Sequence, residues 1–120
     1  MTIQECYLQL GGDYAQAQKR LLNESLVRRF ITKFLSDDSF AALCRAMEAG
    51  QRAEAFRAAH TLKGVCANLS FDRLFASASQ LTELLRPEAD AIPDGADALL
   101  ETVRQDYELT VSAIRACLEV

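Results

Sequence analysis

The chain has 120 residues, of which half are apolar and a quarter are charged, a balance typical of one globular domain spanning residues 1–120. Its net charge is −4 and its isoelectric point is near 5.0, so it lacks the basic surface that nucleic-acid binding requires. No apolar run approaches the roughly eighteen residues of a transmembrane helix, and the N-terminus lacks the basic and apolar regions of a signal peptide. We therefore expect a cytoplasmic protein that binds neither nucleic acid nor membrane.

Cysteine spacing gives no sign of a metal site. The four cysteines form no Cys-x-x-Cys pair, and only one histidine is present to join them as a ligand. We therefore expect no metal and no cofactor. Most of the cysteines fall on apolar stripes, where the residue behaves as a small hydrophobe, so we expect reduced structural thiols at Cys6, Cys44, Cys66 and Cys117.

Helical signals follow one another along the chain, and no segment shows the alternating pattern of a β-strand. In chain order the expected helices cover residues 3–10, 14–22, 24–36, about 39–49, about 51–69, 71–86 and about 96 to the C-terminus. Residues that favour helix N-caps precede three of them: Asp13, Asn23 and the run 37–39. Gly50 ends the fourth helix and Pro87 ends the sixth. The pattern predicts an all-α protein, an antiparallel four-helix bundle with short additional N-terminal helices.

The helix expected at about 51–69 carries an apolar stripe and, beside it, a different set of residues. Small and apolar side chains recur in steps of four and three and are expected to face the core: Ala55, Ala59, Leu62, Cys66 and Leu69. At 100° per residue, His60, Lys63 and Gly64 fall on an adjacent face. We therefore expect the His60 imidazole on the flank of the bundle.

The residues on that face have complementary chemistry. A neutral imidazole is a good nucleophile near neutral pH, and Lys63, one turn from His60, can offset the charge of a phosphoryl group on the ring. A glycine inside a helix lowers stability by roughly 0.5–1 kcal/mol relative to alanine. Access for a partner would explain why a glycine is present at position 64 in spite of this loss of stability. Singly, a surface histidine and a solvated lysine are ordinary. Together the three residues predict a site of phosphoryl transfer, which needs little beyond positioning and charge.

One segment resembles a known family. His60-Thr-Leu-Lys63-Gly64, with Ala58-Ala59 before it and residues 65–69 after it, closely resembles the signature of the histidine-containing phosphotransfer (Hpt) domain. The similarity extends over nearly the whole chain, through short flanking segments typical of stand-alone bacterial members: Gly11-Gly12-Asp13, Asn23-Glu24, Lys33-Phe34-Leu35, Ser39-Phe40 and Ala55-Phe56.

The resemblance implies a function and a set of partners. In this family an exposed histidine takes a phosphoryl group on Nε2 from the aspartate of a receiver domain and passes it to another, which would make His60 the phosphoacceptor. Lys63 would stabilise the phosphate and Gly64 would admit the partner. The implied partners are response-regulator receiver domains and a sensor or hybrid histidine kinase. The chain would be a monomeric carrier without kinase activity, and it has no P-loop or other nucleotide-binding glycine motif.

Two positions depart from the family pattern. Ser70 stands where the family usually has glycine at the end of the histidine helix, and a left-handed serine there would carry strain of about 1 kcal/mol. A glutamine that hydrogen-bonds the histidine in some members falls on Thr82, which leaves Thr82 and the nearby Gln80 as candidates for orienting the imidazole. Thr61 and Ala67, beside the histidine, are expected to face the partner.

Two other interpretations compete with the phosphocarrier. The first is a helical interaction module that binds a receiver or another signalling protein and carries no phosphate. The second is a true enzyme such as a phosphatase or hydrolase, but the acidic residues near the motif, Glu54 and Asp72, are too ordinary to build an acid/base set. The presence of both His60 and Lys63 favours the carrier.

Overall fold

The computed structural model describes residues 1–119, and all the regular structure in that range is helical. The seven helices are α1 (Ile3–Leu10), α2 (Tyr14–Leu21), α3 (Glu24–Phe34), α4 (Ser39–Glu48), α5 (Arg52–Leu69), α6 (Asp72–Leu84) and α7 (Ala96–Leu118). The predicted all-α class is confirmed. The histidine helix begins one residue later than its expected range and ends at the expected residue.

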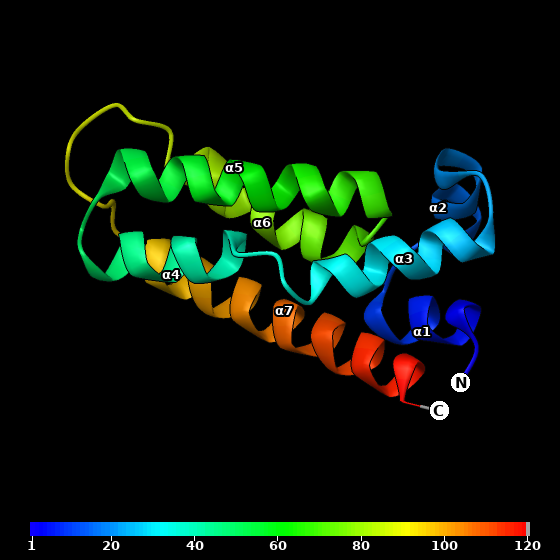
Figure 1. Ribbon diagram of the computed structural model, residues 1–120. Helices are drawn as coiled ribbons and strands as arrows, with labels where there is room; N and C mark the ends of the chain where they lie inside the picture. The colour runs from blue at the N-terminus through cyan, green and yellow to red at the C-terminus, as the bar shows by residue number, and fades with distance from the viewer. Residues whose placement is uncertain (120) are drawn as a thin grey trace.

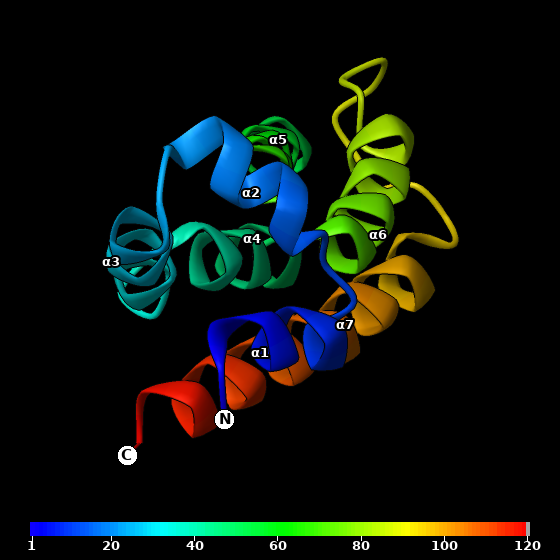
Figure 2. The same cartoon turned by 90° about the vertical axis from the view of Figure 1, so that its right-hand side faces the viewer.

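Helices α4, α5, α6 and α7 alternate in direction and form an antiparallel four-helix bundle (Figure 1). A three-residue connection precedes α5 and a two-residue connection follows it, which makes α4 and α6 its antiparallel partners. The extra helices α1, α2 and α3 gather at the end of the bundle where α5 finishes. Helix α1 lies along the C-terminal part of α7, as both views show (Figure 2).

Aromatic side chains join the N-terminal helices to the bundle. The Phe34 and Phe71 rings meet edge to face with centroids 5.2 Å apart, and Tyr7 lies 5.6 Å from Phe71. On the other side of this cluster, Tyr107 stacks on Phe40 at 4.2 Å. Such ring pairs stabilise the fold beyond the effect of the apolar area that each ring buries. Helices from both halves of the chain therefore share one core.

The N-caps expected at Asp13 and Asn23 are both present. The side chain of Asp13 accepts a hydrogen bond from the backbone N–H of Gln16, and that of Asn23 accepts one from Leu26. Each satisfies one of the backbone donors that a helix start leaves unpaired. These local signals set the starts of α2 and α3.

The apolar periodicity of the last helix predicts an inward stripe, and the structure confirms it only in part; the residues of the stripe are Leu99, Val103, Tyr107, Val111, Ile114 and Leu118. Val103 and Ile114 are fully buried, but Leu99, Tyr107 and Val111 are half-buried. Towards the C-terminus small residues take the buried positions, because α1 packs closely along this part of α7. These residues are Thr110, Ala113 and Cys117.

Candidate functional site

The buried stripe of α5 orients the His60 side chain. All five residues predicted to face the core, from Ala55 to Leu69, are buried, and His60 is exposed. Because successive helical residues are rotated by about 100°, burying that stripe forces His60 onto the flank of the bundle. The structure thus presents the imidazole to solvent, as the periodicity predicted.

The ring of Phe56 supports the imidazole from the preceding turn. The Phe56 and His60 rings are nearly parallel, with an interplanar angle of 18° and centroids 5.9 Å apart. Side chains of a helix lean towards its N-terminus, so residues four apart meet in this way. Within the described chain, the imidazole nitrogens make no hydrogen bond to protein. Stacking on Phe56 is therefore the contact that fixes the ring.

Lys63 and Gly64 lie on either side of the space in front of His60. The Lys63 side chain is half-buried, on the side of α5 that faces α6. A Cβ atom built on Gly64 would meet nothing within 4 Å, so no neighbouring element explains the glycine. A bare, exposed helical surface next to a histidine leaves room for another molecule to approach.

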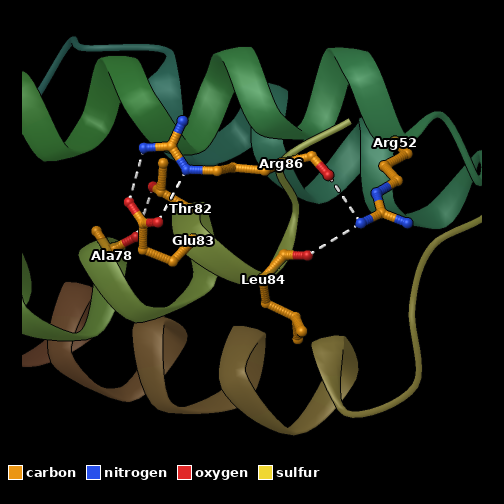
Figure 3. A network of polar contacts seen from close by, with 6 residues as sticks. All are labelled: Arg52, Ala78, Thr82, Glu83, Leu84 and Arg86. Carbon is orange, nitrogen blue, oxygen red and sulfur yellow. Dashed lines mark hydrogen bonds and ion pairs between the residues drawn. The ribbon is translucent and has the colours of Figure 1, made fainter. Parts of the chain in front are cut away.

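Neither candidate for orienting the imidazole contacts it through a hydrogen bond. Thr82 is fully buried, and its hydroxyl donates to the carbonyl of Ala78 at 2.7 Å (Figure 3). This is the usual back-bond of a threonine inside a helix, and it uses the only hydroxyl proton. Gln80 is exposed on α6. The nearest ordering contact for His60 comes instead from Phe56.

An arginine that sequence reasoning missed lies over Phe56 and is paired with a glutamate. Arg86 Nε and Nη2 bond to the two carboxylate oxygens of Glu83 at 2.8 and 2.9 Å (Figure 3). The guanidinium carbon lies 5.8 Å from the centroid of the Phe56 ring, a cation–π arrangement. The sequence held one signal, a Glu and an Arg three residues apart, but the contact with Phe56 depends on how α5 and α6 pack.

The Glu83 carboxylate is under the influence of two cations. Its hydrogen bonds to Arg86 hold the pKa of the carboxyl below its ordinary value, and the positive charge of Lys63 lowers it further. Glu83 is thus electrostatically coupled to the lysine next to His60. This places one anion and two cations on the α6 side of the imidazole.

Arg52, at the start of α5, is a buried arginine that sequence reasoning also missed. Its guanidinium donates to four backbone carbonyls at distances of 2.8 to 3.4 Å, those of Leu84, Leu85, Arg86 and Ala91. The first three are carbonyls at the end of α6 that the helix itself leaves unpaired. Arg52 therefore fixes the turn from which the Arg86 side chain extends (Figure 3).

The residues expected to face a partner are both exposed. Thr61 and Ala67 lie on the outer surface of α5, on the same side as Gly64. Next to them a shallow groove of about 210 Å³ runs between α3 and α5. Apolar and polar side chains line it: Phe30, Lys33, Phe34, Asp37, Val65, Asn68 and Leu69.

The sequence expectation for Ser70 holds as far as its backbone is concerned. Ser70 is left-handed, with φ 56° and ψ 41°, and it caps the C-terminus of α5. The structure adds a compensating contact, because Arg20 Nη1 donates to Ser70 Oγ at 2.8 Å. The same nitrogen donates to the carbonyls of Ala67 and Asn68. The hydrogen bonds from Arg20 therefore stabilise the end of α5 and offset the backbone strain that a glycine at position 70 would avoid.

Residues 1–119 contain neither a cluster of metal ligands nor a membrane-spanning helix. No group of three or more His, Cys, Asp and Glu side chains is placed to hold a metal ion. None of the described helices is both long and apolar enough to cross a membrane.

Comparison with known proteins identifies the family. The family model for the Hpt domain matches residues 25–118, which include the whole bundle and the motif around His60. The chain belongs to the Hpt domain family. Curated proteins and solved structures gave no match. Hpt domains carry phosphoryl groups on histidine in two-component phosphorelays, where they interact with receiver domains and kinases.

Proposed function

We propose that this chain is a phosphocarrier of a phosphorelay and that His60 is its phosphoacceptor. The observation that carries the proposal is the exposed imidazole beside an unobstructed Gly64, on the face of α5 within the family match. We further propose a stand-alone monomer in the cytoplasm, with response-regulator receiver domains and a sensor or hybrid histidine kinase as partners.

The transfer step follows from the chemistry of the ring. The lone pair of a neutral imidazole, on Nε2, attacks the phosphorus of an aspartyl phosphate in a receiver domain. An N–P bond forms, the P–O bond to the aspartate breaks, and the aspartate leaves as a carboxylate. The proton remains on Nδ1, so the ring of the phosphohistidine is positively charged. The reverse step breaks the N–P bond and regenerates the neutral imidazole of His60. The protein supplies position and charge, which is most of what phosphoryl transfer requires.

Two neighbours have distinct roles in this proposal. The Lys63 ammonium, one turn from His60, offsets the negative charge of the phosphoryl group. Gly64 leaves the surface low enough for the receiver to bring its aspartate to the ring. The groove between α3 and α5 gives the receiver an adjoining surface, and Thr61 and Ala67 are exposed on the same helix.

Phosphoryl transfer from a labelled receiver domain tests the acceptor. We expect the wild-type chain to take up label that is acid-labile, and the His60→Gln variant to take up none while its helical circular dichroism stays unchanged. Label retained in His60→Gln would contradict the proposal. Binding of the receiver without any transfer to the wild-type chain would instead favour a pure interaction module.

The same assay tests the role of Lys63. Lys63→Ala should slow transfer or shorten the lifetime of the phosphohistidine, because the phosphoryl charge is then offset less well. Lys19→Ala, at an exposed lysine of α2 outside both the site and the α3–α5 groove, serves as the control for a general loss of positive charge. Equal rates and lifetimes for Lys63→Ala and the wild type would assign Lys63 to the surface.

A further inference from the structure

Glu83 is on α6, and its carboxylate feels the charge of Lys63, the lysine one turn from His60. Its two carboxylate oxygens are both occupied by Arg86, at 2.8 and 2.9 Å. The charge of Lys63 also acts on this carboxylate and favours its ionised form. Both cations on the α6 side of His60 are therefore coupled to the same anion.

The position of Arg86 is determined at both ends of its side chain. At the backbone, its carbonyl accepts a hydrogen bond from Arg52 Nη2 at 2.8 Å, which ties the end of α6 to the start of α5. From there the side chain extends away from Arg52, towards Glu83 and Thr82 (Figure 3). Its guanidinium lies over the ring of Phe56, the same ring on which His60 stacks. Arg86 is thus held one aromatic ring away from the imidazole.

Phosphorylation would change the balance of charge in this cluster. A phosphoryl group brings about two negative charges and three acceptor oxygens, and arginine binds such groups through two parallel hydrogen bonds. The Arg86 side chain is 56% exposed, so its guanidinium can exchange one anionic partner for another by rotation about its side-chain bonds, without any movement of α6. A single carboxylate then competes with a more highly charged group for the same cation.

We propose that Glu83 is a positioning residue that holds Arg86 in the unphosphorylated protein and releases it to a phosphoryl group on His60. In this arrangement Glu83 opposes phosphorylation, because the phosphorylated state must break the Glu83–Arg86 pair that the free state keeps. Glu83 thereby sets how the phosphoryl group divides between His60 and a receiver aspartate. The inference rests on the proposed function, since it presumes that His60 carries the group.

The equilibrium of transfer tests the inference. The chain is mixed with a receiver domain that has been phosphorylated with acetyl phosphate, and the ratio of phosphohistidine to aspartyl phosphate is measured at equilibrium. Equilibrium is reached when the same ratio is obtained from the phosphorylated receiver and from the phosphorylated chain as starting material. This ratio depends on the stability of the two phosphorylated proteins and not on how fast they dock. Glu83→Gln should raise the ratio by about two- to fivefold, as expected for the modest strength of an exposed ion pair.

A second ion pair of the same kind gives a matched control. Glu101 and Arg104 are also three residues apart and 3.5 Å from each other, and the Arg104 guanidinium also lies over a phenylalanine, Phe40, at 5.5 Å. This pair is on α7, away from the face of α5 that carries His60. Glu101→Gln should leave the ratio unchanged. An increase of equal size in Glu101→Gln would show a general effect of net charge and overturn the inference.

A double-mutant cycle separates positioning from simple repulsion between Glu83 and the phosphate. Arg86→Gln alone should lower the ratio, and in that background Glu83→Gln should raise it less than half as much as in the wild type. A full increase in the absence of Arg86, or no increase in its presence, overturns the inference. A wild-type chain that takes no phosphoryl group refutes the proposed function itself, whereas normal uptake with an unchanged ratio refutes only the role of Glu83.

Discussion

Replacing Arg52 with methionine is expected to destabilise the bundle substantially, although the residue is charged and lies at a helix start. Methionine keeps the length of the apolar stem and removes every hydrogen bond of the guanidinium. Those bonds reach four carbonyls, and two of them, to Arg86 at 2.8 Å and to Ala91 at 3.1 Å, have good length. The other two, to Leu84 and Leu85, are 3.3 and 3.4 Å long and contribute less.

The magnitude follows from the two short bonds. A hydrogen bond from a charged donor contributes about 1.5–3 kcal/mol, but water can replace part of it for carbonyls near the surface. The positive charge also sits at the negative end of the α6 dipole, which adds to the stabilisation. We therefore expect Arg52→Met to lower the free energy of unfolding by about 2–4 kcal/mol. Arg52→Lys should fall between the two, because an ammonium cannot bridge carbonyls spread over this turn.

Urea unfolding followed by circular dichroism measures the loss, with Arg57→Met as the control. Arg57 is on the same helix, is exposed, and pairs only with Glu54, so its replacement should change stability by less than about 0.5 kcal/mol. Hydrogen exchange should also speed up in residues 84–91 before the rest of the bundle opens. Equal stability of Arg52→Met and Arg57→Met would show that the four carbonyls are as well satisfied by water, and would refute the reasoning.

Three further predictions concern glycine, left-handed residues and pH. Gly64→Ala should raise the free energy of unfolding by about 0.5–1 kcal/mol, because the added Cβ meets no neighbouring atom and alanine favours the helix. Gly64→Phe should fold but should slow phosphoryl transfer from a receiver. A destabilised alanine variant, or unimpaired transfer in the phenylalanine variant, would contradict this. Leu22→Gly should stabilise the protein by about 0.5–1 kcal/mol in thermal unfolding, since Leu22 is 77% exposed and has a φ of 81°. Ser70→Gly should change stability by less than about 0.5 kcal/mol, because the variant also loses the hydrogen bond from Arg20. A larger gain in stability at Ser70 than at Leu22 would be inconsistent with that hydrogen bond. Burial raises the pKa of the Cys6 thiol from 9.0 to about 12, so the contribution of the protonated thiol to stability is complete below pH 9 and is lost as the pH rises towards 12. Between pH 8 and 10.5 the urea midpoint should therefore fall less steeply with pH in Cys6→Ala than in the wild type. Equal pH slopes of the midpoint in the two proteins would refute the assignment.

The sequence was sufficient to predict what depends on periodicity. The stripe from Ala55 to Leu69 repeats at the helical period, and that alone determines which side of α5 is buried and that His60 is exposed. Caps at Asp13 and Asn23 were equally predictable, because a capping side chain bonds to a backbone donor only three residues away. Both kinds of signal are local.

What the sequence did not predict depends on contacts between distant segments. Nothing in the sequence singled out Arg52, because only the fold brings the end of α6 and residue 91 to its guanidinium. Glu83 and Arg86 could be paired from their spacing, but the position of Arg86 over Phe56 requires the packing of α5 on α6. The start of α4 at Ser39 was predicted, but the Asp38 side chain does not cap this helix, because it bonds to Arg45 instead of the helix backbone.

The C-terminus of α5 shows how the first two helices contribute to the bundle. Three consecutive carbonyls at this end, those of residues 67–69, accept hydrogen bonds from side chains far away in the sequence. Arg20 donates to the first two, and the Tyr7 hydroxyl donates to Leu69 at 2.8 Å. The turn before α2 is also in close contact with this helix end, since a Cβ on Gly12 would lie 2.7 Å from the Ser70 oxygen.

The boundary of the family match is therefore not a boundary of the folding unit. A fragment starting at residue 25 would keep the whole motif and lose every one of these donors, leaving the last turn of the histidine helix to water. The place of Tyr7 against Phe71 would also be empty. Transplanting this Hpt domain into another protein, as a fusion or a chimera, would require the first 24 residues to be moved with it.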